Sequence, residues 1–332
     1  MIDTLNETRS DPMHQPEVSV IIPAFNAEPF IAQSIQSVLN QSFSDFELIV
    51  VDNLSTDKTA MKAEQFEDPR VHVIKCHKQG AAAARNQGFA NAAGKYIQFL
   101  DADDMMAANK IELQLKVIKV NDPVRTIASC AWSRFEGETD KASLTPEPVW
   151  TITDPIEWIV CSLSGGGMMH SGAWLVHRDL ITAAGPWDES LSLHDDGEFY
   201  TRILLQAESQ QFVADTQVFY RNVAGSLSRA RSPEAINSAF RVCQLRDKHL
   251  LEHCDNRQTR QAVATQYAQF AYEFSDSAVS LVRSALERIK DLGEKPVNTI
   301  GGIWFRELVR IIGFERTLFA RSFLKPGRHS AS

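Results

Sequence analysis

Cysteine is scarce in this chain, and the few cysteines stand far apart. Five occur among 332 residues, without Cys-x-x-Cys spacing: Cys76, Cys130, Cys161, Cys243 and Cys254. This pattern argues against a disulfide framework and against a structural zinc site. No apolar run approaches the roughly 20 residues that span a bilayer, and the stretch Met1–Glu17 lacks the apolar core of a secretory signal. We therefore expect a protein of the reducing cytoplasm.

Net positive charge is lacking too, and so are the glycine-rich loops that hold phosphates. The formal net charge is −8, which argues against a nucleic-acid partner because such proteins carry basic patches. Neither Gly-x-Gly-x-x-Gly after the first predicted strand nor Gly-x-x-x-x-Gly-Lys-Ser/Thr occurs, so a dinucleotide fingerprint and a P-loop are both excluded. Without such a backbone cradle, a metal ion must neutralise any bound diphosphate.

Three carboxylates follow an apolar segment that is typical of a short β-strand. Residues 94–100 carry aromatic and β-branched side chains, and Asp101, Asp103 and Asp104 come directly after them. Clustered carboxylates require water or a cation, and oxygen ligands suit Mg²⁺ or Mn²⁺. The alternative is a solvated acidic turn that caps a helix near residues 109–111. The surrounding sequence decides between the two.

Strand and helix patterns alternate before these acids. We expect strands at 18–22, 46–51, 71–74 and 94–100, and helices at 30–39, 56–66 and 81–93. This alternation predicts βαβ units and a mostly parallel sheet. Ligands of such sheets bind outside the carboxyl ends of the strands, where Pro23–Asn26, Asp52 and Asp101–Asp104 fall. Their convergence predicts a binding site.

Several segments together resemble one family. They are Val20–Asn26, Ser37–Gln41 with Phe46–Asp52, Gly80–Gly88 with its Ala84-Arg85-Asn86, and Phe99–Asp104. In this order they resemble family-2 glycosyltransferases, from Val18 to about Ser228. The resemblance implies an inverting enzyme with the α/β GT-A (nucleotide-diphospho-sugar transferase) fold, in which helices flank a mostly parallel, Rossmann-like sheet. We divide the chain into a polar tail (1–16), a nucleotide-sugar-binding half (17–120), an acceptor-binding half (121–231) and a helical C-terminal extension (232–332).

The resemblance also implies a metal site among the three acids. Asp103 would ligate a divalent metal, Mn²⁺ or Mg²⁺, that bridges the two phosphates of a nucleotide sugar. Asp101 would contact the ribose, or the metal through water, and Asp104 would support them.

The nucleotide sugar would have further contacts, again as the resemblance implies. These are Pro23, Ala24, Phe25, Asn26, Asp52, Arg85 and Ala102. Asp52 would accept the N–H of a uracil or thymine ring, and Phe25 would offer a ring face to the base, with core packing as its alternative. Many relatives continue with Asp-Gly-Ser where this chain has Asn53-Leu54-Ser55, a change that removes one charge and one glycine.

The second half is similar to the acceptor side of the family. Gly185–Leu191 resembles its Gly-Gly-Phe-Asp-Glu segment, and His194–Phe199 resembles its paired acids at the start of a helix. On this alignment Asp196 is the catalytic base that deprotonates the acceptor hydroxyl, and Asp195 supports it. The alternative is that both acids cap the helix N-terminus.

Histidines supply no predicted ligand. His194 is interpreted as an ordinary exposed or hydrogen-bonded side chain, and His170 and His177 as too isolated for a site. Relatives often carry a histidine shortly after a Tyr-Arg pair, in a segment similar to Tyr220 through Ser228. There this chain has Val223 and its neighbours instead.

The last segment is predicted to form an amphipathic basic helix. Trp304, Leu308, Ile311 and Ile312 share one face, and from residue 303 onward six basic residues oppose two acids. Such helices can lie on anionic membranes. Peripheral membrane contact through 303–325, on the inner face of the membrane, and docking on the enzyme or in a homodimer are the alternatives.

These observations predict a metal-dependent inverting glycosyltransferase. It would move a sugar from a nucleotide-diphosphate donor to a hydroxyl of a glycan or lipid-linked acceptor, in cell-surface polysaccharide or glycoconjugate synthesis. A UDP-hexose is the first expectation for the donor and a dTDP-sugar the second. One alternative is a catalytically silent nucleotide-sugar-binding or scaffold protein, motivated by Asn53, Leu54 and Val223. A nucleotidyltransferase is disfavoured because Pro23–Asn26 is not a glycine-rich phosphate loop.

Overall fold

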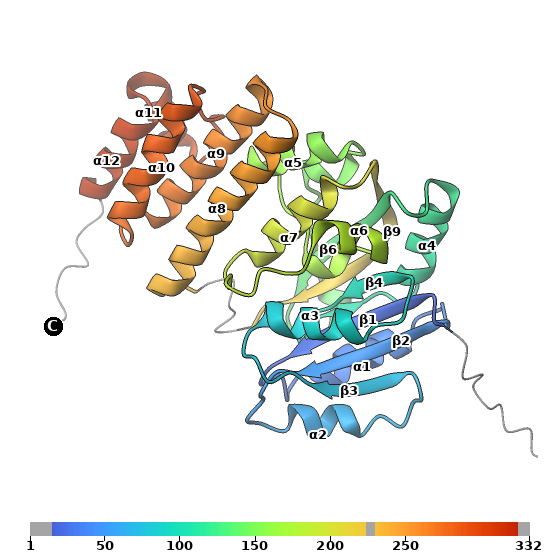
Figure 1. The fold of residues 1–332 in the computed structure, drawn as a ribbon. Coiled ribbons are helices and arrows are strands. Elements are labelled where there is room, and N and C mark those ends of the chain that lie inside the picture. The colour runs from blue at the N-terminus through green and yellow to red at the C-terminus, as the bar shows by residue number, and fades with distance from the viewer. Residues whose placement is uncertain (1–14, 224–229, 325–332) are drawn as a thin grey trace, which may run out of the picture.

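The computed structural model describes residues 15–223 and 230–324 (Figure 1). Most of the predicted tail, the end of the segment that follows Tyr220, and the end of 303–325 lie outside the described residues. The strands are β1 Val18–Ala24, β2 Phe46–Asp52, β3 Val71–Lys75, β4 Tyr96–Phe99, β5 Met105–Met106, β6 Thr126–Phe135, β7 Ser143–Leu144, β8 Val176–His177 and β9 Ser209–Arg221.

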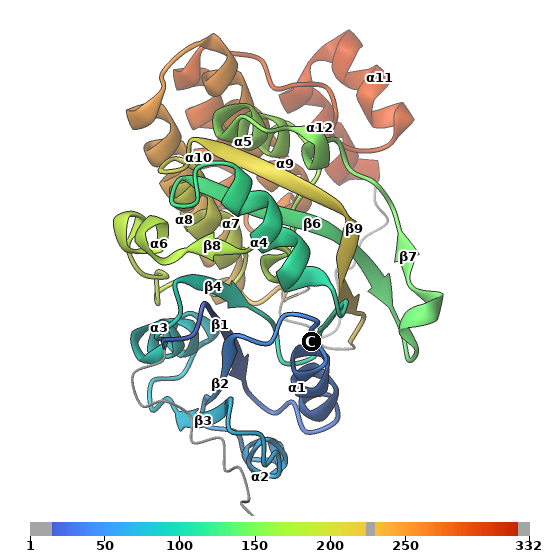
Figure 2. The ribbon, with the colours of Figure 1, turned by 90° about the vertical axis from the view of Figure 1, so that its right-hand side faces the viewer.

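A mostly parallel sheet forms the first half. Within the described part of the chain its order is β3-β2-β1-β4-β8, and only β8 runs antiparallel to its neighbour. Helices α1 (Ile31–Leu39) and α3 (Ala81–Asn91) lie on opposite sides of it, as Figure 2 shows. A Cβ at Gly88 would lie 2.3 Å from Cγ2 of Ile21, so α3 can approach β1 this closely only because residue 88 has no side chain. The predicted parallel sheet is confirmed.

The end of strand β1 differs from our prediction. Strand β1 continues through Pro23 to Ala24, although we expected it to end before the proline. The carbonyl of Ile21 accepts from Leu100 N, and the strand pairing with β4 ends there. The missing N–H of Pro23 points to the same side and therefore costs no ladder bond.

Helix α2 is shorter than predicted. It spans Thr59–Glu64 rather than 56–66. The carboxylate of Asp57 accepts from Thr59 N at 3.0 Å and from Glu28 N at 3.0 Å. Asp57 therefore holds residues before the helix in a loop that is tied to the end of β1.

A second, mixed sheet forms the other half. Within the described residues its order is β5-β9-β6-β7. Strands β6 and β9 run parallel with a bulge between Cys130 and Ala131, and β9 pairs antiparallel with the short β5. Because β5 follows the three acids almost directly, β9 carries its last residues back to the carboxyl end of β4.

The remaining helices cover the second sheet and build the C-terminal extension. They are α4 Lys110–Val120, α5 Pro155–Leu163, α6 Arg178–Ala184, α7 Asp195–Leu204, α8 Pro233–His253, α9 Arg257–Phe274, α10 Val279–Leu292, α11 Ile303–Ile312 and α12 Phe314–Leu324, with 3₁₀ turns at Thr139–Lys141, Pro148–Thr151 and Ser171–Ala173. Helices α8 to α12 stack beside α7 and α5, away from the parallel sheet (Figure 1). No helix in the described ranges combines the length and apolarity needed to cross a bilayer.

Candidate functional site

The three predicted acids lie together in the turn after β4. Asp104 is fully buried, its Oδ1 accepts from Arg221 N at 2.9 Å, and its Oδ2 lies 3.0 Å from Nε2 of His170. Asp101 is partly exposed, and its Oδ2 lies 4.0 Å from Nε2 of His170. Burial, together with the charges of Asp104 and Asp101, raises the pKa of Asp103 to about 7. The turn is an anion-rich pocket that favours a proton or a cation.

His170 belongs to this cluster, so our interpretation of it as an isolated side chain was wrong. Ligand atoms of Asp101, Asp104 and His170 lie within 4.8 Å of one another. Burial opposes a charge on the imidazole, but the neighbouring Asp104 and Asp101 raise the pKa of His170 to about 8. His170 Nδ1 accepts a hydrogen bond from Gly172 N at 3.1 Å. A neutral ring therefore carries its proton on Nε2, facing Asp104, and orients that carboxylate.

Arg221 fastens the acidic turn to the rest of the fold. Its Nε donates to the carbonyl of Asp103 at 2.7 Å and its Nη2 to Gln33 Oε1 at 2.7 Å. The guanidinium also lies 5.0 Å from the ring centroid of Phe30 and 4.4 Å from that of Phe135. The turn is thus held between α1 and the end of β9.

Arg85 connects the acidic turn with the start of α7. It is buried, and its guanidinium donates to Asp101 at 2.8 Å and to Asp195 at 3.0 Å. Burial opposes the charge of Arg85, but the two carboxylates outweigh it and raise the guanidinium pKa. Burial also raises the pKa of Asp195 to about 6, against the pull of Arg85. We predicted Arg85 as a contact of the donor; in the structure it joins the two acidic motifs.

The segment that resembles Gly-Gly-Phe-Asp-Glu packs against Arg85. The ring of Trp187 lies 4.4 Å from the guanidinium and is stacked on Phe199 with centroids 3.9 Å apart. Asn86, next to Arg85 on α3, accepts from Trp187 N at 2.9 Å and donates to Trp187 O at 3.0 Å. This segment, Gly185–Leu191, therefore holds α7 against α3, and we call it the clip.

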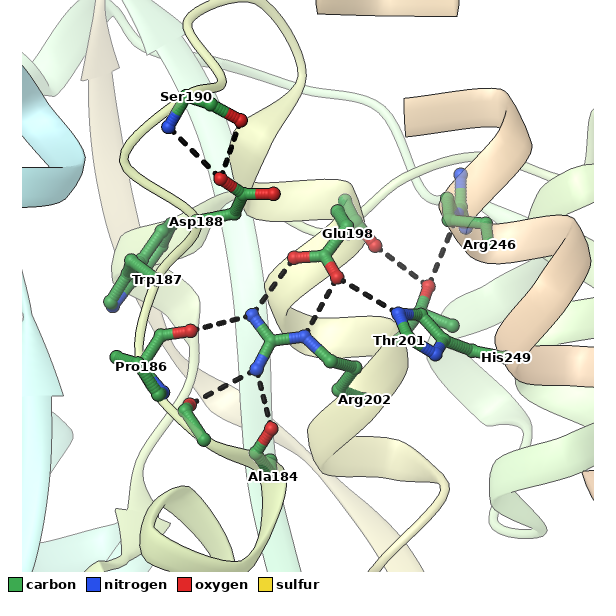
Figure 3. A network of polar contacts seen from close by, with 12 residues as sticks. Ala184, Pro186, Trp187, Asp188, Ser190, Glu198, Thr201, Arg202, Arg246 and His249 are labelled. Carbon is green, nitrogen blue, oxygen red and sulfur yellow. Dashed lines mark hydrogen bonds and ion pairs between the residues drawn. The ribbon is translucent and has the colours of Figure 1, made fainter. Parts of the chain in front are cut away.

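A second arginine, Arg202, also holds this clip (Figure 3). Arg202 donates to the carbonyls of Ala184 at 2.5 Å and Pro186 at 2.8 Å, and it forms a two-point ion pair with Glu198 at 2.7 and 2.9 Å. His249 of α8 lies 3.2 Å from the same carboxylate. Helix α7, the clip and the C-terminal extension are thus joined by one charged network.

The donor-side residues predicted on β1 and β2 also meet at the strand ends. Asp52 is buried and its Oδ1 has no hydrogen-bond partner among the described residues. Phe25 is half exposed at the end of β1. A buried carboxylate oxygen without a donor, beside an exposed aromatic ring, fits a planar ligand that brings an N–H.

Other predicted contacts have structural partners. Asn26, with φ of 47°, accepts through Oδ1 from Thr56 N at 2.8 Å. Asn53 donates to the carbonyl of Lys78 at 2.7 Å and accepts from Gly80 N at 2.7 Å. A carboxylate could not donate the first of these bonds, so the amide at position 53 has a structural reason. Ala102 is buried, and its carbonyl accepts from Ser34 Oγ at 2.8 Å.

Asp196 lies one residue beyond Asp195, at the first turn of α7. Its Oδ1 accepts from Gly197 N at 2.8 Å within the first turn of α7, while the N-cap position belongs to His194 and carries no side-chain cap. Its negative charge also acts on Arg85 and His170 on one side and on His194 and Arg246 on the other. Asp196 therefore stands between the acidic turn and the pocket beside α8. His177, by contrast, caps α6 and contacts the ring of Tyr96.

Comparison with known proteins settles the family. Residues 19–181 match the sequence profile of "Glycosyl transferase family 2". These residues belong to that family. The matched range contains β1 to β4, the acidic turn and His170. It ends before Asp195 and Asp196.

Curated relatives match part of the chain. The chain is 40% identical over 144 residues to an uncharacterized glycosyltransferase of Haemophilus influenzae, covering 42% of this chain and 58% of the relative. It is 42% identical over 106 residues to WfgD of Escherichia coli, a UDP-Glc:alpha-D-GlcNAc-diphosphoundecaprenol beta-1,3-glucosyltransferase, covering 32% and 42%. The chain thus spans about half the length of these relatives.

A solved structure matches almost the whole chain. S. aureus TarS 1–349 in complex with UDP-GlcNAc superposes with a TM-score of 0.69 at 18% identity, over 92% of this chain and 90% of that chain. At such identity the likeness shows the fold alone. The predicted GT-A fold with a C-terminal helical region is therefore confirmed.

The acidic turn of this family-2 domain has the chemistry of a divalent-metal site. Asp101, Asp103 and Asp104 supply the hard oxygen donors that Mg²⁺ and Mn²⁺ prefer. Burial first, and then the negative charges of Asp104 and Asp101, raise the pKa of Asp103, so an unpaired negative charge is unfavourable there. Nε2 of His170 lies 3.0 Å from Asp104 Oδ2, where a neutral imidazole can support that carboxylate.

Proposed function

We propose that this protein is a metal-dependent inverting glycosyltransferase. It transfers a sugar from a nucleotide-diphosphate donor, first of all UDP-linked, to a hydroxyl of a glycan or lipid-linked acceptor in cell-surface polysaccharide synthesis. The observation that carries the proposal is the bridge formed by Arg85. It brings the acids after β4 into one site with Asp195 and the neighbouring Asp196.

Each group of residues has a separate task in this reaction. Asp52 accepts an N–H of the nucleobase and Phe25 covers its face. Asp101 and Asp103 would hold a divalent metal, with Asp104 in support, and the bound metal would supply the positive charge that stabilises a departing diphosphate. Arg85 keeps the acids in place.

Asp196 receives the proton of the acceptor hydroxyl. The hydroxyl oxygen forms a bond to the anomeric carbon while the bond from that carbon to the phosphate oxygen breaks, and the nucleoside diphosphate leaves. Because the attack occurs opposite the leaving group, the anomeric configuration inverts. A single base is sufficient, since no covalent enzyme intermediate forms.

The test uses the purified full chain with Mn²⁺ or Mg²⁺ and a panel of UDP- and dTDP-sugars. We expect nucleoside diphosphate release that disappears with EDTA and in Asp196→Asn, but persists in Asp215→Asn, an exposed acid on β9. Donor binding without any turnover would instead favour the silent binding protein. Donor binding is measured in parallel by thermal shift, because a ligand that binds the native state raises the unfolding temperature.

The proposal also covers where in the cell the protein acts. Helix α11 exposes Ile303, Trp304 and Ile311, with exposed fractions of 69%, 85% and 77%. Arg306 and Arg310 lie on the same helix, which supports contact of a cytoplasmic protein with the anionic inner face of a membrane. In a sedimentation assay with vesicles that contain anionic lipid, the wild type should pellet with the vesicles, whereas Trp304→Ser/Ile311→Ser should stay in the supernatant. Dimerisation through α11, seen as a change in mass with no vesicle binding, would contradict this.

A further inference from the structure

A pocket lies on the far side of Asp196 from the acidic turn. Its volume is about 250 Å³, and α5, α7, α8 and α9 contribute to its walls. The walls include buried Trp158, Tyr200 and Phe270. Ligand pockets usually have volumes of about 300 Å³ or more. This pocket is slightly smaller and has room for a group the size of a single sugar ring. Half of its wall comes from the C-terminal extension, outside the family-2 match.

Arg246 of α8 is the cation in this pocket. Its Nε donates to Thr201 Oγ1 at 2.9 Å (Figure 3). A Cβ at Gly197 would lie 3.7 Å from its Nη1, which places the guanidinium against the first turn of α7, beside Asp196. Neither Nη1 nor Nη2 has a hydrogen-bond partner among the described residues. These N–H groups therefore line the pocket without a protein acceptor.

Two of the neighbouring acids are engaged elsewhere. Glu198 is paired with Arg202 at 2.7 Å and with His249 at 3.2 Å. Glu273, which also lines the pocket, is paired with Arg231 at 2.7 Å. Burial lowers the pKa of the Arg246 guanidinium, which reflects how incompletely its charge is compensated. A guanidinium that presents unpaired N–H groups to a pocket is a ready site for an anion, because its planar fork matches carboxylate and phosphate oxygens.

We propose that this pocket receives the acceptor and that Arg246 binds an anionic group, a phosphate or a carboxylate, that the acceptor carries near its reacting hydroxyl. The inference rests on the proposed function, because Asp196 is the base at the mouth of the same pocket. Trp158, Tyr200 and Phe270 supply apolar faces against which a sugar ring packs. Acceptor choice is then made by the C-terminal extension rather than by the donor-binding half.

Two matched pairs of probes test the binding step without turnover. They are glycerol 3-phosphate against glycerol, and glucuronic acid against glucose, each titrated into the full chain and followed by NMR. The wild type should bind at least one anionic member about tenfold or more tightly than its neutral partner. The phosphate and carboxylate arms show which anion is preferred. Arg246→Gln should remove the difference, Arg246→Lys should restore part of it, and Arg241→Gln, an exposed arginine on the same helix, should keep it.

Turnover gives the second readout. With a donor that the wild type uses, the ratio of kcat/KM for the anionic over the neutral acceptor should fall about tenfold in Arg246→Gln. Equal binding of both members of each pair to the wild type would overturn the inference, and so would a preference that survives in a folded Arg246→Gln. Absence of donor turnover in the wild type would overturn the proposed function instead, and the NMR titration would still decide whether Arg246 binds anions.

Discussion

Arg85 donates from Nη1 to a carboxylate oxygen of Asp195 at 3.0 Å, although 110 residues separate the two in the sequence. The same guanidinium holds Asp101 at 2.8 Å and lies against Trp187. One buried cation therefore couples the end of β4 with the start of α7. The distance between the acids after β4 and the proposed base therefore depends in part on this side chain.

Replacing Arg85 should damage stability and activity together. Arg85→Met leaves two carboxylates without their partner in a buried site, so the free energy of unfolding should fall by about 3 kcal/mol. Displacement of the acids should lower kcat/KM about 100-fold, because catalysis tolerates little misplacement. Chemical denaturation and donor turnover measure the two effects. Arg260→Met, which breaks an exposed pair with Asp255, should change the stability by less than about 1 kcal/mol, and equal losses in both variants would refute the special role of Arg85.

His170 and Asp103 should respond differently to metal titration. Because the hydrogen bond from Gly172 N leaves the His170 proton facing Asp104, His170→Gln should weaken Mn²⁺ binding about tenfold, as the loss of a supporting group does. Asp103→Asn should abolish measurable binding. Mn²⁺ affinity followed by EPR separates the cases. Loss of binding in the histidine variant with retention in Asp103→Asn would make the imidazole a direct ligand and reverse the assignment.

Much of the fold could be predicted because its signals are local. The apolar runs of β1, β2 and β4 and the helix-forming residues of α3 can each be recognised within a few consecutive residues of the sequence. The end of β1 was missed because Pro23 is tolerated only where pairing with β4 has stopped, and that is a property of the neighbour strand. We predicted a helix α2 that is too long, because Asp57 lies in a loop before the helix and accepts a hydrogen bond from the backbone of another loop.

The site could be predicted in part for a similar reason. Carboxyl ends of parallel strands must meet, so the convergence of Asp52 with Asp101–Asp104 followed from the pattern. The supports of these acids could not be predicted. His170 and Arg221 reach the turn from distant segments, and no local spacing marks them. Arg246 was missed because it looks like an ordinary charged residue on the amphipathic helix α8.

Leu54 stores strain that glycine would relieve. It has φ of 63°, in the left-handed region, at the position where many relatives carry glycine. This conformation costs a residue with a Cβ about 1 kcal/mol, and the side chain is nearly half exposed, so little burial is lost on its removal. Leu54→Gly should therefore leave the stability unchanged or raise it by up to about 1 kcal/mol. Urea unfolding of this variant beside Leu144→Gly, an exposed leucine of β7, tests the idea, and a clear loss of stability in Leu54→Gly would contradict it.

Lys110 should make the stability of the protein rise with pH above about 8. Its ammonium group is fully buried and donates to Gln98 and, at 2.7 Å, to Gln114, and no carboxylate among the described residues pairs with it. Burial lowers the pKa of Lys110 to about 8, while the neighbouring Cys130 stays a neutral thiol because burial raises its pKa to about 11. In the unfolded chain lysine keeps its proton up to about pH 10.4.

Between these two pKa values the unfolded state binds more protons than the native state, so the free energy of unfolding increases with pH. The contribution of Lys110 is isolated by urea unfolding of the wild type and of Lys110→Met at pH 7.5, 8.5 and 9.5. The difference, wild type minus variant, should increase at each step, because all other groups titrate alike in both proteins. A difference that stays flat or declines over this range would show that the buried ammonium keeps an ordinary pKa, held by the two glutamine oxygens.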